Sequence, residues 1–360
     1  MKIYHIINSL NLGGAERLVV DMCKEMSFSD NEINLILLSN SKSNLIDEVK
    51  ANKNIKLINL KNKNLFNIKI LFQLNKYIKD ADIIHLHLFP TLYWGVFYRL
   101  FFMKRKSKLF FTEHSTENNR RNKIYLKFIE KKVYSSLDRV ICISSSTKSN
   151  LINHLGKKFE KKCVVINNGI DLLKFQNSSS YKKEDFNFNI NDFILIQIAS
   201  FRLAKDQLTV IKSLKKLPTQ VKLLLVGDGS ERSNIENLIN QLDLEDRVIL
   251  LGNRPDIPEL VNMCDVVIVS SNYEGFGIAA VEGMACGKPI VASDVAGLSE
   301  IVSEYGILFP KGNIDKLAFI INRLIKDELF YLKKSKLCLD RANNYSIGTV
   351  VERYLSEYKK

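Results

Sequence analysis

The sequence predicts an α/β protein built from two doubly wound domains. Strand-like apolar runs alternate with helix-length segments twice along the chain, and a polar stretch separates the two series. Several strand runs are continuously apolar, as expected for parallel strands that helices cover on both faces. The length of 360 residues also exceeds one ordinary domain.

The first series predicts a domain over residues 1–174. It begins with an apolar run at 2–8, a Gly13-Gly14 turn and a helical pattern that continues to Met26. Further strands are expected at 33–38, 55–58, 82–88, 108–113, 138–143 and 162–167. Helices are expected at 66–80, 91–102, 122–136 and 145–155.

The polar composition of the next stretch is typical of a linker, which we place at 175–191. The second series predicts a domain over 192–344, with strands at 193–199, 221–226, 247–251, 265–269, 289–292 and 306–309. Its helices are expected near 206–216, 230–241, 256–263 and 278–286. An apolar helical stripe in 345–360 predicts a last helix that packs back on the first domain. Two such domains place a cleft between them, where we expect a ligand.

The net charge of +14 is unevenly distributed. Residues 1–180 hold 30 Lys and Arg against 15 Asp and Glu, whereas 181–360 hold 23 against 24. The basic excess therefore lies in the first half and predicts an anionic partner there, either nucleic acid or an anionic membrane surface.

Two features favour a cytoplasmic protein. The six cysteines show no CxxC and no metal-binding spacing, which argues for a reducing compartment and against disulfides or structural zinc. The apolar stretch at the N-terminus is too short for a signal peptide, and residues 83–103 fit a strand, loop and helix better than a membrane span.

The stretch 270–294 carries the strongest signal for chemistry. It contains a glycine turn, Glu274-Gly275-Phe276-Gly277, and then an apolar helical run with one acid, Glu282. A glycine loop at the start of a helix presents free N–H groups and suits phosphate. Because two glutamates would repel a phosphate, we expect them to bind hydroxyls, and a sugar nucleotide offers both groups. On one helix the two acids would be about 12 Å apart, too far for the roughly 5 Å of a retaining glycosidase pair.

This stretch closely resembles the signature of retaining glycosyltransferases of family 4, which have the GT-B fold of two Rossmann-like domains. Other segments match that family in order along essentially the whole chain: 13–16, 138–144, 168–171, 201–206 and 226–229. The resemblance implies a nucleotide-sugar donor as substrate, with neither a cofactor nor a metal at the diphosphate.

The resemblance also implies roles for residues of the second domain. Glu274 would lie beside the transferred sugar and Glu282 would bind the ribose hydroxyls. The backbone of Gly275, Phe276 and Gly277 would face the sugar and phosphate. Arg202 and Lys205 would clamp the diphosphate, where fixed cations stabilise the charge that develops on the leaving group. Many relatives have more residues between this Arg and Lys, which makes the role of Arg202 less secure than that of Lys205.

Residues of the first domain have weaker signals. Gly13 and Gly14 could aim N–H groups at phosphate or could form a plain tight turn. His114 ends a strand, where family members often have a histidine that touches the donor sugar or acceptor; a structural role is the alternative. His85 and His87 alternate on one strand and could ligate metal, but the sequence shows no third ligand.

Two further segments each allow a functional and a purely structural explanation. Asp80-Ala81-Asp82 has the form of the DxD metal motif of a different glycosyltransferase fold, and we interpret it as a helix end. Aromatic residues and cations crowd 93–132, which fits either an interfacial helix on anionic lipid or a covering helix with a solvated basic face. Many family members act on lipid-linked glycans, which favours contact with the inner face of the plasma membrane. Nucleic acid is disfavoured because no nucleic-acid-binding motif is found.

The sequence thus predicts a retaining glycosyltransferase that transfers a sugar to a hydroxyl of a glycan or lipid-linked acceptor in capsule, lipopolysaccharide or cell-wall glycan synthesis. The sugar, base and acceptor stay open. Two alternatives are a sugar-nucleotide epimerase of similar fold and a non-catalytic basic protein that binds membrane or nucleic acid.

Overall fold

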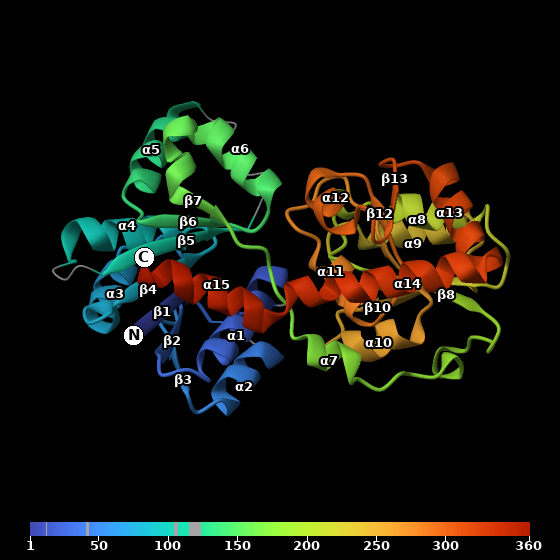
Figure 1. Cartoon of the computed structure of the whole chain (residues 1–360), viewed down its shortest axis with the longest axis horizontal. Coiled ribbons are helices and arrows are strands. Elements are labelled where there is room, and N and C mark those ends of the chain that lie inside the picture. Colours follow the sequence, from blue (N-terminus) through green and yellow to red (C-terminus); the bar gives the residue numbers. More distant parts are fainter. Residues whose placement is uncertain (12, 41–42, 104–106, 115–123) are drawn as a thin grey trace. The chain divides into compact units, whose positions relative to one another are not determined.

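The computed structural model describes residues 1–11, 13–40, 43–103, 107–114 and 124–360 (Figure 1). The chain divides into two compact units, which are described separately. Unit 1 comprises Met1–Gly169 and Ile347–Lys360, and unit 2 comprises Ile170–Ser346.

Unit 1 is built on a parallel sheet of seven strands in the order β3-β2-β1-β4-β5-β6-β7. The strands are β1 (Lys2–Ile7), β2 (Glu32–Leu37), β3 (Ile55–Asn59), β4 (Ile83–His87), β5 (Lys108–Glu113), β6 (Arg139–Cys142) and β7 (Cys163–Val165). The helices are α1 (Gly14–Met26), α2 (Asn44–Ala51), α3 (Lys69–Ile78), α4 (Thr91–Phe101), α5 (Ile124–Ser135), α6 (Ser145–Leu155) and α15 (Ile347–Lys359).

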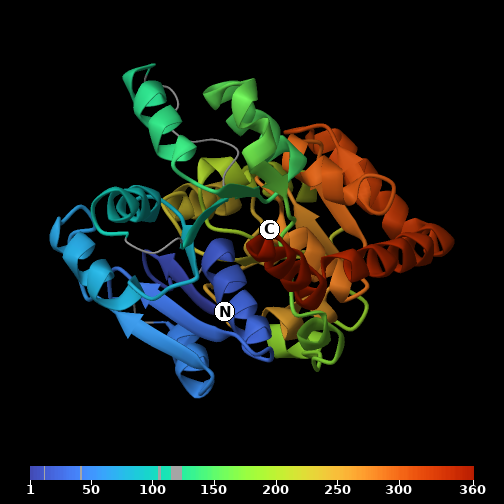
Figure 2. The same cartoon turned by 60° about the vertical axis from the view of Figure 1, so that its left-hand side comes forward.

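Helices cover both faces of this sheet. One core contains buried residues of α3, α4, α5 and α6, and the other contains buried residues of α1, α2 and α15. The view in Figure 2 shows α5 and α6 standing beside the β6–β7 end of the sheet. The last helix joins the second core through Val350, Tyr354 and Tyr358, which are spaced four apart and lie on one helical face.

Unit 2 repeats the architecture with six parallel strands in the order β10-β9-β8-β11-β12-β13. The strands are β8 (Phe193–Ile198), β9 (Val221–Val226), β10 (Val248–Gly252), β11 (Val266–Val269), β12 (Ile290–Ser293) and β13 (Ile307–Phe309). The helices are α7 (Leu172–Gln176), α8 (Gln207–Leu214), α9 (Arg232–Gln241), α10 (Ile257–Met263), α11 (Ile278–Ala285), α12 (Ala296–Val302), α13 (Ile314–Lys326) and α14 (Glu328–Ala342).

The expected linker at 175–191 is instead part of unit 2. The Tyr181 hydroxyl donates to Asp256 over 2.7 Å, and the Lys183 ammonium donates to the Asp192 carbonyl over 2.6 Å. Two of its side chains thus bond to other parts of unit 2, and composition alone could not distinguish this from a solvated linker.

Membrane spans and disulfides are not found in the described part of the chain. None of its helices combines the length and the apolar character needed to cross a bilayer. All six cysteines are free thiols.

Candidate active site

The strand order locates the site of unit 2. From β8 the chain winds outward to β9 and β10, and then crosses back to β11 on the other side of β8. The β8–β11 boundary is therefore the switch point, where ligands of doubly wound sheets bind beyond the carboxyl ends of the strands. The loop after β8 carries Arg202 and Lys205, and the loop after β11 carries Glu274.

The switch point brings Lys205 and Glu274 together. The Lys205 ammonium donates to Glu274 Oε2, and the two side chains are 26% and 15% exposed. Glu274 Oε1 also accepts from the Gly275 amide over 3.2 Å, and the Ser271 hydroxyl lies 3.5 Å from Oε2. A partly buried cation and carboxylate are thus held together at the switch point of unit 2.

Hydrogen bonds fix the two loops to each other. The Asn272 amide donates to the Ala204 carbonyl over 2.8 Å, and its side chain donates to the Leu203 carbonyl over 2.6 Å. The buried Gln197 side-chain amide donates to the carbonyls of Lys205 and Ser270 over 2.7 and 3.2 Å. These four bonds hold the backbone of Lys205 in a defined relation to the loop that carries Glu274.

Two glycines allow close packing around Glu274. Gly277, at the N-cap of α11, has a φ of +90°, and a Cβ there would lie 2.3 Å from a methyl carbon of Leu298. A Cβ on Gly297 would lie 2.3 Å from the carbonyl oxygen of Glu274. The loop can therefore approach α12 this closely only because these residues lack side chains.

The remaining predicted residues of unit 2 lie on the same two loops and on α11. Phe276 is 2% exposed and packs edge-on against Tyr345 at 5.6 Å between ring centroids, so its backbone rather than its ring is available to a ligand. Glu282 is half-buried and lies in the second turn of α11. Arg202 is exposed at the start of the 3-10 turn Leu203–Lys205.

The predicted residues of unit 1 lie at the carboxyl ends of its strands. Gly13 and Gly14 follow β1 at the start of α1, but the Glu16 carboxylate lies over Gly13, with Oε2 only 2.4 Å from where a Cβ would be. Burial raises the pKa of Glu16. His114 follows β5, and its Nε2 lies 3.3 Å from Nδ1 of His87. Burial lowers the pKa of His114 to about 4, so its ring is neutral at pH 7.

Comparisons with known proteins match these two halves separately. Residues 12–173 match the model of glycosyltransferase family 4, and residues 179–344 match that of glycosyl transferases group 1. The chain belongs to glycosyltransferase family 4.

Individual relatives of this chain are also named as glycosyltransferases. An uncharacterized glycosyltransferase of Methanocaldococcus jannaschii is 31% identical over 69% of this chain and 67% of its own. The N-acetylgalactosamine-N,N'-diacetylbacillosaminyl-diphospho-undecaprenol 4-alpha-N-acetylgalactosaminyltransferase of Campylobacter jejuni is 25% identical over 98% of this chain and 99% of that enzyme. Two other relatives, 34% and 31% identical, are matched over 51% and 55% of their length, so the match spans about half of each.

The fold prediction is confirmed by solved structures. Anabaena HepE in complex with UDP and glucose superposes with a TM-score of 0.89 at 24% identity, covering 100% of this chain and 99% of that one. The glycosyltransferase therefore has the GT-B fold of two Rossmann-like domains.

The aromatic segment of the glycosyltransferase is divided between core and surface. Trp94 is 7% exposed and donates from Nε1 to the Leu65 carbonyl over 2.7 Å, so it is a core residue and not an interfacial anchor. Leu100 and Phe101 at the end of α4 are 61% and 71% exposed. The cations at 104–106 and 115–123 lie outside the described residues.

The aspartates of the DxD sequence have structural partners. Asp80 accepts from the Lys2 ammonium over 2.8 Å and from the Tyr4 hydroxyl over 3.2 Å, and Asp82 accepts from the Lys2 amide over 2.8 Å. They therefore connect the region after α3 to β1, which agrees with the interpretation of this motif as a helix end.

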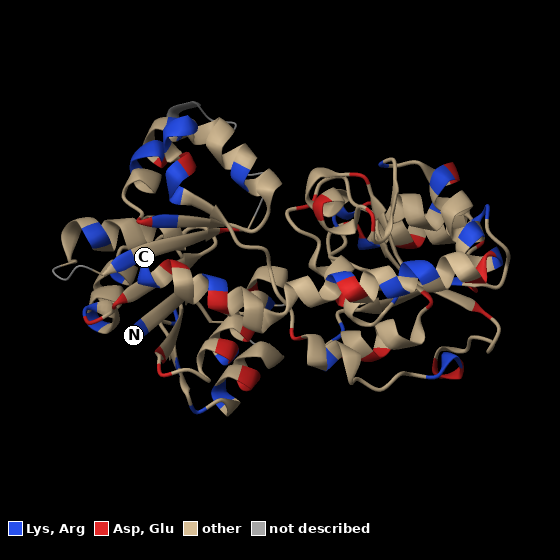
Figure 3. Cartoon of the chain, in the orientation of Figure 1, with Lys and Arg blue, Asp and Glu red and all other residues tan. Residues whose placement is uncertain are grey.

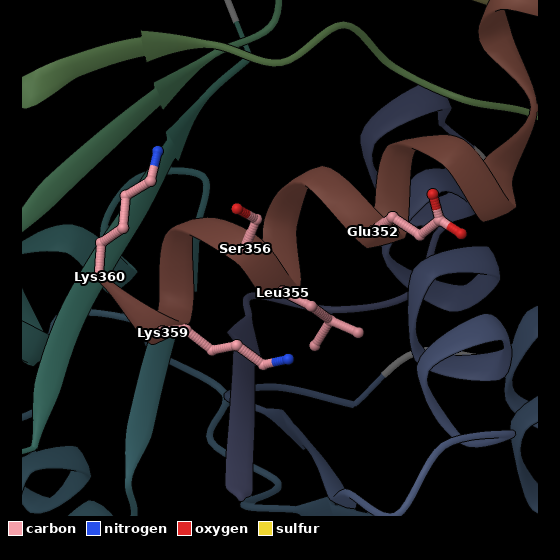
Figure 4. Close-up of a pocket in the computed structure, with 5 residues that line it drawn as sticks. All are labelled: Glu352, Leu355, Ser356, Lys359 and Lys360. Carbon is pink, nitrogen blue, oxygen red and sulfur yellow. The ribbon is translucent and has the colours of Figure 1, made fainter.

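A hollow of about 500 Å³ lies along α15 of the glycosyltransferase (Figure 4). It is lined by four residues of this helix and by the residue that follows it: Glu352, Leu355, Ser356, Lys359 and Lys360. It shares no residue with the predicted site.

One group of residues was missed by sequence reasoning. His85 and His87 have a third histidine beside them, because His5 of β1 pairs in register with His85 of β4. The sequence alone showed no third histidine beside His85 and His87, and strand pairing brings His5 there. The signal was available, since β1 and β4 are neighbours wherever a doubly wound sheet reverses at its first strand.

Proposed function

We propose that this glycosyltransferase transfers a sugar from a UDP-sugar to a hydroxyl of a lipid-linked glycan, with retention of the anomeric configuration. The observation that carries the proposal is the Lys205–Glu274 pair at the switch point of unit 2. The UDP-bound HepE structure and the diphospho-undecaprenol acceptor in the name of the Campylobacter relative support the choice of donor and acceptor.

The leaving diphosphate is the group that this site is suited to stabilise. Lys205 is fixed through its backbone and partly buried, so its charge acts in a medium of lower dielectric than water. When the donor binds, the ammonium can bond to phosphate while staying near Glu274. The first turn of α11, which begins without a side-chain cap, adds N–H donors and positive dipole.

The two glutamates divide the rest of the donor. Glu274 accepts from hydroxyls of the transferred sugar, and Glu282, in the second turn of α11, accepts from those of the ribose. With both carboxylates engaged in this way, a front-face reaction is the mechanism we favour. The bond from the anomeric carbon to the diphosphate oxygen breaks, the acceptor oxygen bonds to that carbon from the same face, and the departing phosphate takes the hydroxyl proton. This mechanism needs neither a metal nor a cofactor.

His114 serves the transfer as a neutral group. Its lowered pKa keeps the ring uncharged, so that it can hydrogen-bond to a sugar hydroxyl as a neutral donor or acceptor. Nε2 faces His87, which leaves Nδ1 for the substrate.

We further propose that unit 1 contacts an anionic membrane through α3, α4 and α5. These helices cover the same face of the sheet and carry exposed apolar side chains: Phe72, Leu100, Phe101, Phe128 and Ile129. Figure 3 shows Lys and Arg along α5, where Lys127, Lys131 and Lys132 lie. Apolar side chains beside cations suit the interface of an anionic leaflet.

The transfer is tested by incubating the protein with UDP-glucose, UDP-galactose and their N-acetylated forms, with and without polyprenyl-diphosphate-linked glycans. UDP release that needs acceptor, with an α-linked product by NMR, is expected. Epimerised donor without acceptor would indicate an epimerase instead. Lys216→Ala, which removes an exposed cation of unit 2, is the control for Lys205→Ala.

The membrane contact has its own test. Leu100→Ser with Phe101→Ser is expected to reduce co-sedimentation with vesicles containing phosphatidylglycerol. Phe28→Ser removes an aromatic ring that is 80% exposed after α1 and should leave binding unchanged. Equal binding by all three proteins would exclude this face.

A further inference from the structure

Three histidines of unit 1 come together on one face of its sheet. His5 and His85 are in register on the neighbouring strands β1 and β4, and His87 follows two residues later on β4. Side chains two apart on a strand point to the same face. All three rings are fully buried, and one potential ligand atom from each lies within 4.8 Å of the others.

The separation of the rings approaches that of metal ligands. Nδ1 of His5 lies 3.0 Å from Nε2 of His87. Two nitrogens bound tetrahedrally at about 2.0–2.1 Å from one zinc ion are roughly 3.3 Å apart. The His5–His87 nitrogen pair therefore needs to open by only a few tenths of an ångström to hold an ion. The His85 ring is stacked on His87 at 4.4 Å between centroids, so it has to turn before its lone pair points at the same ion.

The surroundings provide the outer contacts of a metal site. His85 Nε2 lies 2.8 Å from the Thr112 hydroxyl, and His87 Nδ1 lies 3.3 Å from His114 Nε2. Each of these rings can thus donate through one nitrogen and use the other as a ligand, as metal-binding histidines do. The Tyr358 hydroxyl contacts the remaining nitrogen of His85 and offers an oxygen as a fourth ligand.

The metal-free cluster has an unsatisfied polar atom. In the contacts His114–His87 and His87–His5, each pair uses one N–H and one lone pair. Nε2 of His5 is then buried without a hydrogen-bond partner among the described residues, whichever tautomers are chosen. An ion on Nδ1 of His5 would leave this atom unchanged, but the ion would accept the lone pairs of the two nitrogens that face each other in the His5–His87 contact.

We propose that His5, His85 and His87 bind one divalent ion of the zinc class, with Tyr358 beside it. Three imidazoles are the ligand set of known zinc sites, and imidazole also suits copper and nickel. Because Tyr358 belongs to α15, the ion would attach the last helix of the chain to the sheet of unit 1. Its role would be structural and independent of the chemistry at Glu274.

The test uses the full chain without a histidine tag, purified without chelator. Elemental analysis is expected to find one equivalent of zinc, and dialysis against a chelator should lower the Tm. Zinc should restore the Tm, and cobalt(II) should bind 1:1 with the visible absorption of a tetrahedral site. His87→Asn and His5→Gln should weaken cobalt binding at least tenfold. His154→Gln is the control, since this partly buried histidine pairs with Glu130 outside the cluster.

Wild-type protein that neither contains metal nor binds zinc or cobalt at micromolar concentrations would overturn the proposal. So would unchanged binding in both cluster variants. UDP calorimetry on each variant reports whether unit 2 is still folded, and the wild-type titration decides the question even if a variant does not fold.

Discussion

Gly297→Ala tests whether the close packing around Glu274 is required for activity. The new Cβ would lie 2.3 Å from the Glu274 carbonyl oxygen and 2.9 Å from the carbonyl carbons of Glu274 and Gly275. All three are backbone atoms, so no side chain can rotate away. Relief requires the loop or α12 to move by about 1 Å, a displacement that can cost on the order of 100-fold in rate.

The same substitution should also lower the stability of unit 2. Overpacking of this kind costs about 1–3 kcal/mol. At about 2–4 °C per kcal/mol for a unit of this size, the Tm should fall by roughly 2–12 °C. The assay measures UDP release and thermal unfolding in parallel.

Gly312→Ala is the matched control. Gly312 has a φ of +72° and no atom within 4 Å of a Cβ, so alanine there meets backbone strain of about 1–2 kcal/mol without a clash. Its turnover should stay near that of wild type. Turnover of Gly297→Ala within twofold of wild type, or an equal loss in Gly312→Ala, would refute the reasoning.

Three further predictions follow from the same geometry. Lys205→Ala should lower kcat by about 10²–10³ with less than a tenfold change in donor Kd, and equal losses in both would remove the transition-state role. Phe276→Leu should cost about 1 kcal/mol in urea unfolding yet keep kcat/KM within threefold, because its ring lies in the core; a large loss of kcat/KM alone would contradict this. Hydrogen bonds from Arg254, and then from Tyr181, lower the pKa of Asp256 to about 2, so the folded state binds this proton less readily than the unfolded state. The stabilisation by ionised Asp256 is complete above about pH 5 and is lost as pH falls towards 2. Asp256→Asn should therefore destabilise the protein by about 1 kcal/mol at neutral pH, after allowance for solvent screening. This loss in the free energy of unfolding should become smaller between pH 5 and pH 3.

Local patterns in the sequence predicted much of this glycosyltransferase. Continuous apolar runs identified most strands because parallel strands are buried on both faces. The turn at Glu274–Gly277 was recognisable because its glycines and acids are adjacent in sequence. Residues brought together by strand order were harder to predict. The Lys205–Glu274 pair joins loops 69 residues apart, and His5 meets His85 across 80 residues.

Composition does not reveal which polar residues have specific partners in the fold. The stretch 175–191 had the character of a linker, but Tyr181 and Lys183 bond to loops of unit 2. The aromatic segment 93–132 fitted either an interfacial helix or a covering helix, and the indole of Trp94 within it is a core group that donates to a backbone carbonyl. In both cases the sequence shows the chemical type of a side chain and not the partner that satisfies it.

Calorimetric titration with UDP, GDP and their sugars tests the central claim most directly. The account predicts 1:1 binding of UDP and of at least one UDP-sugar, weakened tenfold or more by Glu282→Ala and unchanged by Lys216→Ala. Absence of binding by wild-type protein at millimolar concentrations of every nucleotide would contradict it.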